Sequence, residues 1–231
     1  MPFSVAISTF RTPLRKHYWL WLFIAVFLAV WINSFTGTTD VSNWFLENTL
    51  VFLFLGFLLW AHRRYQFSDL SLLLICVYLC LHVYGAKYTY AENPFGYWLK
   101  DHFHWSRNQY DRIVHFSFGF LLAYPLRELF LKWLKFPRWV SWVLPIEITL
   151  SVSSLYELIE WAVADLFFPS QGDAYLGLQG DIWDAQKDVF MAVIGAILAT
   201  TIVSMIKRVG GIYSEEELEA IKQHHHKSTP Y

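Results

Sequence analysis

Three short segments of the chain place acidic residues at helical spacing. In "YDRIVHFSF", Asp111 and His115 are four residues apart, and in "YELIEW", Glu157 and Glu160 are three apart. The segment "GDIWDAQKD" spaces three aspartates by three and four residues: Asp181, Asp184 and Asp188. Residues with these spacings share one face of a helix. Such a set can hold a divalent metal ion, relay protons, or supply a general acid and base, and the sequence leaves these three chemistries open.

These polar groups lie in a chain that is otherwise apolar. Hydrophobic residues make up 55% of the 231 residues and charged residues 16%, against about 25% charged in soluble domains. The formal net charge of -1 gives no support for a nucleic-acid partner. A helix that spans a bilayer needs about 20 mostly apolar residues. The predicted spans cover roughly 17–34, 44–61, 69–85, 110–127, 140–167 and 186–206.

The sequence therefore predicts an all-α polytopic membrane protein, a bundle of about six transmembrane helices in a lipid bilayer. This domain is expected to cover residues 1–208, followed by a cytoplasmic tail, 209–231. Ser214 and Glu217 have the spacing of a capping box, which predicts a short helix in the tail. The segment 126–136, "LRELFLKWLKF", alternates apolar and basic residues as an interfacial helix on the inner leaflet would.

The orientation follows from the basic residues. Most Lys and Arg residues fall in segments on the same side as the N-terminus, which predicts that both termini are cytoplasmic. All three acidic segments then lie in the outer half of the membrane, although the helix count did not require it. An ionised side chain at a helix centre costs roughly 2.5–3.5 kcal/mol. We therefore expect the deeper groups to face the bundle interior and form one site: His115, Glu157, Glu160 and Asp188.

Two structural explanations compete with a functional site. Asp181, as a cap, and Asp184, near the third helical position, could satisfy free N–H groups and offset the helix dipole. Asp188 could pair with Arg112, and Lys187 with a glutamate of the preceding helix, which would tie three helices together.

The charges of this region do not balance in the sequence. The fixed positive charges are Arg112 and Lys187, with Arg107 nearby. The carboxylates are Asp111, Glu157, Glu160, Asp165, Asp173, Asp181, Asp184 and Asp188. The excess must be hydrated, protonated or balanced by a bound cation, so a divalent metal ion is a candidate cofactor.

Each residue of the site has an expected role. The candidate catalytic residues are Asp111, His115, Glu157, Glu160, Asp184 and Asp188. The candidate metal ligands are His115, Glu157, Glu160 and Asp188, with Arg112, Lys187 and Asp181 as supporting residues. The chain has no P-loop, G-x-S-x-G, H-E-x-x-H or C-x-x-C motif, so familiar soluble-enzyme chemistries have no support. The small residues of "GAILA" (195–199) predict close helix packing.

At "YDRIVHFSFGFLL", "YELIEW" and "GDIWDAQKD" followed by "GA", the chain resembles the YjdF family of bacterial inner-membrane proteins. The resemblance extends from the first to the sixth predicted helix and implies an inner-membrane location. The chain is more distantly similar to VanZ-like proteins, which are implicated in glycopeptide resistance. Their pattern corresponds to Asp111, Arg112 and His115, then Glu160, then Asp184 or Asp188 with Gly195. Neither resemblance implies a particular reaction.

Three functions are compatible with the sequence. The leading hypothesis is an envelope protein whose His/carboxylate site opens to the periplasmic side and binds or acts on a lipid-linked or small polar ligand. The second is a proton-coupled transporter, for which Glu147 is the clear polar candidate in the inner half. The third is a non-catalytic scaffold in which the carboxylates only pair with neighbouring cations.

Overall fold

The computed structural model describes residues 17–167 and 176–210, and this part of the chain is helical and contains no strand. The helices are α1 (Tyr18–Thr36), α2 (Val41–Arg64), α3 (Asp69–Ala86), α4 (Pro94–Phe103), α5 (Tyr110–Glu128), the π-helical segment η2 (Leu129–Trp133), α6 (Arg138–Phe167) and α8 (Asp184–Gly210). Six helical segments of the described residues are long and apolar enough to cross a membrane, with η2 extending the α5 segment. The prediction of an all-α membrane bundle is confirmed.

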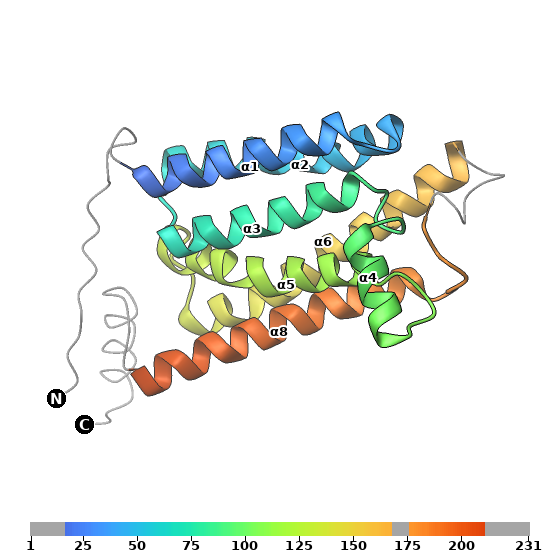
Figure 1. The fold of residues 1–231 in the computed structure, drawn as a ribbon. Coiled ribbons are helices and arrows are strands. Elements are labelled where there is room, and N and C mark those ends of the chain that lie inside the picture. Colours follow the sequence, from blue (N-terminus) through green and yellow to red (C-terminus); the bar gives the residue numbers. More distant parts are fainter. Residues whose placement is uncertain (1–16, 168–175, 211–231) are drawn as a thin grey trace, which may run out of the picture.

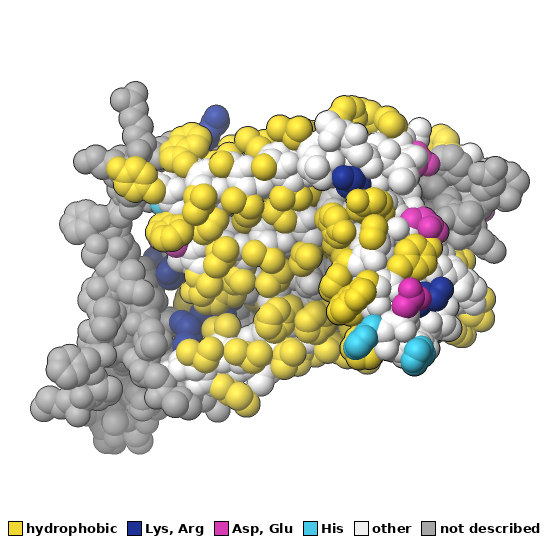
Figure 2. Space-filling model, in the orientation of Figure 1, with side chains coloured by type: hydrophobic (Ala, Val, Ile, Leu, Met, Phe, Trp, Pro, Cys, Tyr) yellow, Lys and Arg dark blue, Asp and Glu magenta, His cyan; other side chains and the backbone are white. Residues whose placement is uncertain are grey.

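Along the chain, successive spanning helices run in opposite directions between the two ends of the bundle (Figure 1). α1, α3 and α6 end where α2, α5 and α8 begin, and we call this the site end of the bundle. Figure 2 shows hydrophobic side chains covering the middle of one face, with charged groups gathered toward its two ends. A bilayer accepts this distribution because the apolar side chains meet hydrocarbon and the charged ones meet the polar boundary.

Helix starts depend on local polar groups that hydropathy does not weigh. α2 begins at Val41, earlier than expected, because the Asp40 side chain accepts a hydrogen bond from the backbone N–H of Asn43 at 3.0 Å. α8 begins at Asp184 rather than near residue 186. The expected division into a domain ending at 208 and a helical tail stays a prediction, since residues 211–231 lie outside the described residues.

The expected interfacial helix over 126–136 was wrong. α5 continues through η2 as part of one spanning segment, Tyr110–Trp133. Leu129 and Phe130 are buried and pack with Ala61 and Phe67 near the end of α2. The amphipathic pattern is real, but its apolar side covers another helix instead of lipid.

The opposite end from the site is fastened by a polar cluster around Glu128. This carboxylate, 3% exposed, accepts hydrogen bonds from Tyr65 at 2.8 Å and from the Ser68 hydroxyl at 2.8 Å. The Ser71 hydroxyl also donates to it, and Lys132 lies 3.2 Å away. These contacts join α5 to the turn between α2 and α3.

α5 and α8 cross with their backbones in contact. A Cβ added at Gly119 would lie 1.8 Å from the Ala192 carbonyl oxygen, and one at Gly195 would lie 2.2 Å from the Phe116 carbonyl oxygen. Ala196, the next residue of α8, is fully buried. Glycine is needed at both positions because no other side chain fits between the helices. The crossing fixes the acidic first turns of α5 and α8 side by side.

The connection from α4 to α5 is held against the start of α8. Asn108 is fully buried, and its backbone N–H donates to the Gln179 side chain at 2.9 Å. The Gln179 amide returns a hydrogen bond to the Asn108 carbonyl at 3.1 Å. This pairing places the preceding residue, Arg107, inside the bundle with only 5% of its surface exposed.

Candidate functional site

The site has two layers, and the first is a network of ion pairs that we call the ion-pair layer. Both guanidinium nitrogens of Arg107 contact Asp184, one of them at 3.0 Å. Arg112 donates to Asp184 at 3.1 Å and to Asp181 at 2.5 Å. Lys187 holds Asp181 from the other side at 2.7 Å. Two aspartates are therefore held by three cations, which leaves one positive charge in excess.

The contacts of the ion-pair layer show that Asp181 and Asp184 bind cations, rather than acting only as caps of the helix. Asp184 is the first residue of α8, not near its third position, and its carboxylate binds arginines. Asp181 accepts from the backbone N–H of Trp183 at 3.2 Å, ahead of the helix. The hydrogen bonds from Lys187 and Arg112 lower the pKa of Asp181 well below its ordinary value. The expected pairing of Lys187 with a glutamate was wrong, because Lys187 pairs with Asp181.

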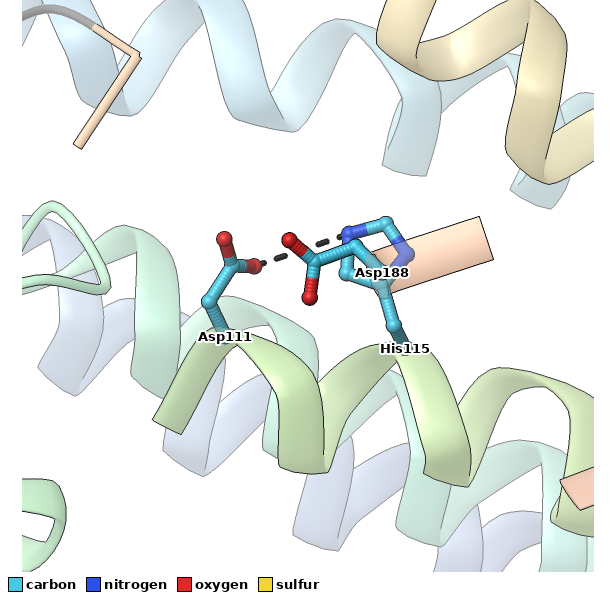
Figure 3. A group of neighbouring side chains, drawn as sticks. All are labelled: Asp111, His115 and Asp188. Atoms are coloured by element: carbon cyan, nitrogen blue, oxygen red, sulfur yellow. Dashed lines mark ion pairs between the residues drawn. The ribbon is translucent and has the colours of Figure 1, made fainter. Parts of the chain in front are cut away.

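Beneath this layer lies a second group, the carboxylate–histidine cluster of Asp111, His115, Glu157 and Asp188. Figure 3 shows Asp111 and His115 on α5 with the Asp188 carboxylate beside them. One ligand atom from each of these three residues lies within 4.8 Å of the others. Nε2 of His115 is 3.5 Å from Asp111 and 3.3 Å from Glu157. Three helices, α5, α6 and α8, thus bring their polar side chains together in one small cluster.

The ring of His115 is oriented by a buried hydroxyl. Its Nδ1 lies 3.4 Å from the hydroxyl oxygen of Ser153, which is 2% exposed. If Nδ1 carries the proton and donates it to that oxygen, Nε2 keeps a lone pair that can bind a ligand. Metal-binding histidines are commonly oriented in this way by a partner on the other nitrogen.

Several buried polar atoms of the cluster have no hydrogen-bond partner within the described residues. They include Oδ1 of Asp188, Oε1 of Glu157 and Nε of Arg112. Asp188 is 2% exposed, and its nearest cation is Arg112, at 3.9 Å. That contact is within ion-pair distance and too long for a hydrogen bond. A buried carboxylate left in this state is costly unless it takes up a proton or a further group binds it.

Two other predicted acidic residues, Glu160 and Asp165, lie apart from the three-residue group. Glu160, one of the expected metal ligands, is half-buried and interacts with Tyr156 on its own helix. Asp165 is exposed. Asp173 lies outside the described residues. Glu157 is close to His115, but the group that could hold a metal contains Asp111 in place of the two glutamates.

Sequence reasoning missed the contribution of α2. Glu47, 7% exposed, accepts a hydrogen bond from the Tyr156 hydroxyl at 2.8 Å, which joins α2 to α6. Its backbone carbonyl lies 3.3 Å from Nε2 of His82, and Nδ1 of His82 lies 2.7 Å from the Tyr90 hydroxyl. Glu47 stands in an apolar helix at the same end as the other acids, and this position was the available signal. His82 itself is buried, with 6% of its surface exposed.

A cavity of about 280 Å³ leads from this cluster into the bundle. Asp111, His115, Ser153 and Tyr156 form part of its wall, and most of the remaining wall is apolar side chains from α2, α3 and α5. Any molecule in the cavity can therefore touch the carboxylate–histidine cluster. The volume is close to the lower limit of small-molecule sites, about 300 Å³.

The fold and its buried polar site define a multi-pass helical membrane protein. The family model described as "Predicted membrane protein (DUF2238)" matches residues 19–208. The chain is 34% identical over 180 residues to "Inner membrane protein YjdF" of Escherichia coli (strain K12), which covers 76% of this chain and 84% of the relative. No solved structure matches the chain significantly.

The chain therefore belongs to the DUF2238 family and is a relative of YjdF. The expected YjdF resemblance is confirmed, as is a multi-pass protein of the inner membrane. The similarity to VanZ-like proteins stays a prediction.

Proposed function

We propose that the carboxylate–histidine cluster binds a divalent metal ion and, with it, binds or acts on a lipid-linked or small polar ligand of the cell envelope. The single observation that carries this proposal is the buried Oδ1 of Asp188, which accepts no hydrogen bond from the described residues and belongs to a three-residue group of atoms that could bind a metal. In the proposed orientation, with both termini cytoplasmic, the site end faces the periplasm.

The charge distribution supports a cation at this position. The ion-pair layer already uses Arg107 and Lys187, and most of Arg112, on Asp181 and Asp184. The basic groups left for Asp111, Glu157 and Asp188 are the imidazole of His115 and the Nε of Arg112. Among the described residues, no further Lys or Arg forms an ion pair with these three carboxylates, so a divalent ion would supply the missing positive charge.

The donor set suits a transition metal better than calcium. Asp111, His115 and Asp188 offer two oxygens and one imidazole nitrogen, a set that Zn²⁺, Mn²⁺ or Fe²⁺ accepts. Glu157 lies next to Nε2 of His115 and could act as a base or a further ligand. A metal here would activate a water molecule or polarise an oxygen of the ligand.

The amount of metal bound by the purified protein tests this proposal directly. The purified full chain, with His224, His225 and His226 replaced by alanine, is dialysed against Zn²⁺ or Mn²⁺ and analysed by mass spectrometry for bound metal. We expect about one ion per chain, and at least a tenfold weaker affinity in Asp188→Asn. Asp165→Asn is the matched control, because Asp165 is exposed near the same end and outside the cluster.

Two outcomes would contradict the metal site. One is a folded parent protein that binds no metal at this position, and the other is full binding by a folded Asp188→Asn protein. Thermal unfolding establishes whether each variant is folded. If Asp188→Asn does not fold, His115→Gln replaces it, because glutamine can retain the contact with Ser153.

The transporter alternative needs a polar path to the opposite end of the bundle. Glu147, the expected inner residue of such a path, has an exposed side chain on α6 and does not line the cavity. The scaffold alternative needs every carboxylate to be paired. Among the described residues, Asp188 and Glu157 each retain a buried oxygen that accepts no hydrogen bond, which favours a ligand-binding role.

A further inference from the structure

We infer that the cavity beside the carboxylate–histidine cluster binds one hydrocarbon chain of a membrane lipid, which enters sideways between α2 and α6. This inference rests on the proposed function and specifies its ligand as a lipid whose polar head lies at the cluster. It assigns the ligand's tail to a separate set of residues, so the two parts can be tested apart.

The wall of the cavity is suited to hydrocarbon. Val51 and Phe54 of α2, Leu79 of α3, and Phe118 and Leu122 of α5 form much of it. A cavity lined in this way is not a favourable place for water, which needs several polar partners. All five residues belong to membrane-spanning segments, so the neighbouring solvent is lipid tails.

Polar groups form one part of the wall. The charged and hydroxyl-bearing groups Asp111, His115, Ser153 and Tyr156 lie on the side of α5 and α6, and His82, Tyr78 and Tyr90 add polar atoms from α3 and the turn after it. A ligand with an apolar tail and a polar head matches both parts of the wall at once. A small polar molecule would fill only the first part and leave apolar surface without a partner.

The mouth of the cavity lies between two helices that face lipid. Leu53 of α2 and Val152 of α6 both line the cavity, and their side chains are 66% and 45% exposed. The hydrogen bond from Tyr156 to Glu47 joins these helices near the site end. Below that bond, the exposed pair marks an opening toward the bilayer rather than toward water.

The volume limits the occupant to one chain. The cavity of about 280 Å³ is close to the lower limit of small-molecule sites, about 300 Å³, so it has room for a single slender group. One chain, or the first part of a longer one, fits this space, and a second chain of the same lipid would remain in the bilayer outside the mouth.

Photo-labelling of the full chain in lipid nanodiscs tests the inference. The probe is phosphatidylglycerol with a diazirine in the middle of one acyl chain, and labelled residues are located by mass spectrometry. We expect label on Leu122, which is only 5% exposed and is reached through the cavity. Leu53→Trp should reduce this label at least fivefold by filling the mouth, and Val152→Trp provides a second blocking variant.

Leu59→Trp is the matched control, since Leu59 is 68% exposed on the same helix and is not part of the cavity wall. It should label like the parent protein. Competition with unlabelled polyprenyl phosphate distinguishes the two sources of a hydrocarbon chain. Displacement of the label identifies an isoprenoid lipid, and retention identifies a glycerophospholipid.

No label on Leu122 in the parent protein would overturn the inference, and so would equal labelling in both blocking variants and the control. A failed tail site would leave the metal measurement unaffected. Conversely, label on Leu122 that persists in Asp188→Asn would support the tail site even if the metal site is wrong.

Discussion

The backbone contact between α5 and α8 provides the sharpest test of how the site is positioned. Gly195→Ala would add a Cβ 2.2 Å from the Phe116 carbonyl oxygen, where ordinary contact begins at 3.4 Å. The helices must therefore part by about 1.2 Å at this point. The obstructing atom belongs to the backbone, so no change of rotamer can relieve the clash.

The expected cost is at the upper end of that for an overpacked core, about 3 kcal/mol. At about 2–4 °C per kcal/mol for a chain of this size, the melting temperature should fall by roughly 6–12 °C. Separation of the helices would also lengthen the contact of 3.1 Å between Arg112 and Asp184, which joins α5 to α8. Metal affinity should therefore fall together with stability.

Thermal unfolding of the purified protein in detergent, followed by tryptophan fluorescence, measures the change. Gly56→Ala is the matched control, because an added Cβ at Gly56 meets nothing within 4 Å. Alanine favours a helix over glycine, so the control should be as stable as the parent or more stable, by up to about 1 kcal/mol. If Gly195→Ala has the same melting temperature as Gly56→Ala, the close crossing of α5 and α8 does not hold the site together, and the argument from glycine packing fails.

Three further changes test the polar groups by thermal unfolding. Arg107→Ala should destabilise the protein by about 3 kcal/mol, the low end for breaking a buried ion pair, because Asp184 keeps its contact with Arg112. Arg107→Lys should cost less. A melting temperature of Arg107→Ala equal to the parent's would contradict the pairing. The pKa of Asp181 is lowered in the folded state, so its contribution to the free energy of unfolding is complete above about pH 4 and is lost as the pH falls toward the folded pKa. The difference in melting temperature between the parent and Asp181→Asn should therefore shrink as the pH falls over that range. A difference that does not change with pH would refute this reasoning. Glu128→Gln should cost roughly 2 kcal/mol by weakening the charged hydrogen bonds at the far end, and metal binding should not change.

The number of helices was predictable from sequence because the bilayer imposes it. A spanning helix must carry a long apolar run, and such runs are visible without knowledge of neighbours. The segment 126–136 shows the limit of this reasoning. Its alternating pattern describes two faces of a helix but does not say whether lipid or protein covers the apolar face.

The site was predictable only in part, for a related reason. Helical spacing placed Asp111 with His115, and Asp184 with Asp188, on common faces. The choice of partners depends on how each helix is rotated and on the path of the connections. Arg107 reaches Asp184 because the turn after α4 folds against the start of α8, and Glu47 comes from a helix far away in sequence. No spacing rule contains that information.

The cavity has one consequence for how relatives of this chain can diverge. Its polar end is carried by α5 and α6, with α8 closely packed behind α5, whereas Leu53 and much of the apolar wall belong to α2. α2 packs mainly on α3. Substitutions along the cavity-facing side of α2 can therefore reshape the space proposed for the lipid tail while Asp111, His115 and Asp188 keep their places. If the proposals hold, selection can tune which lipid is accepted on one helix and preserve the polar site on the others.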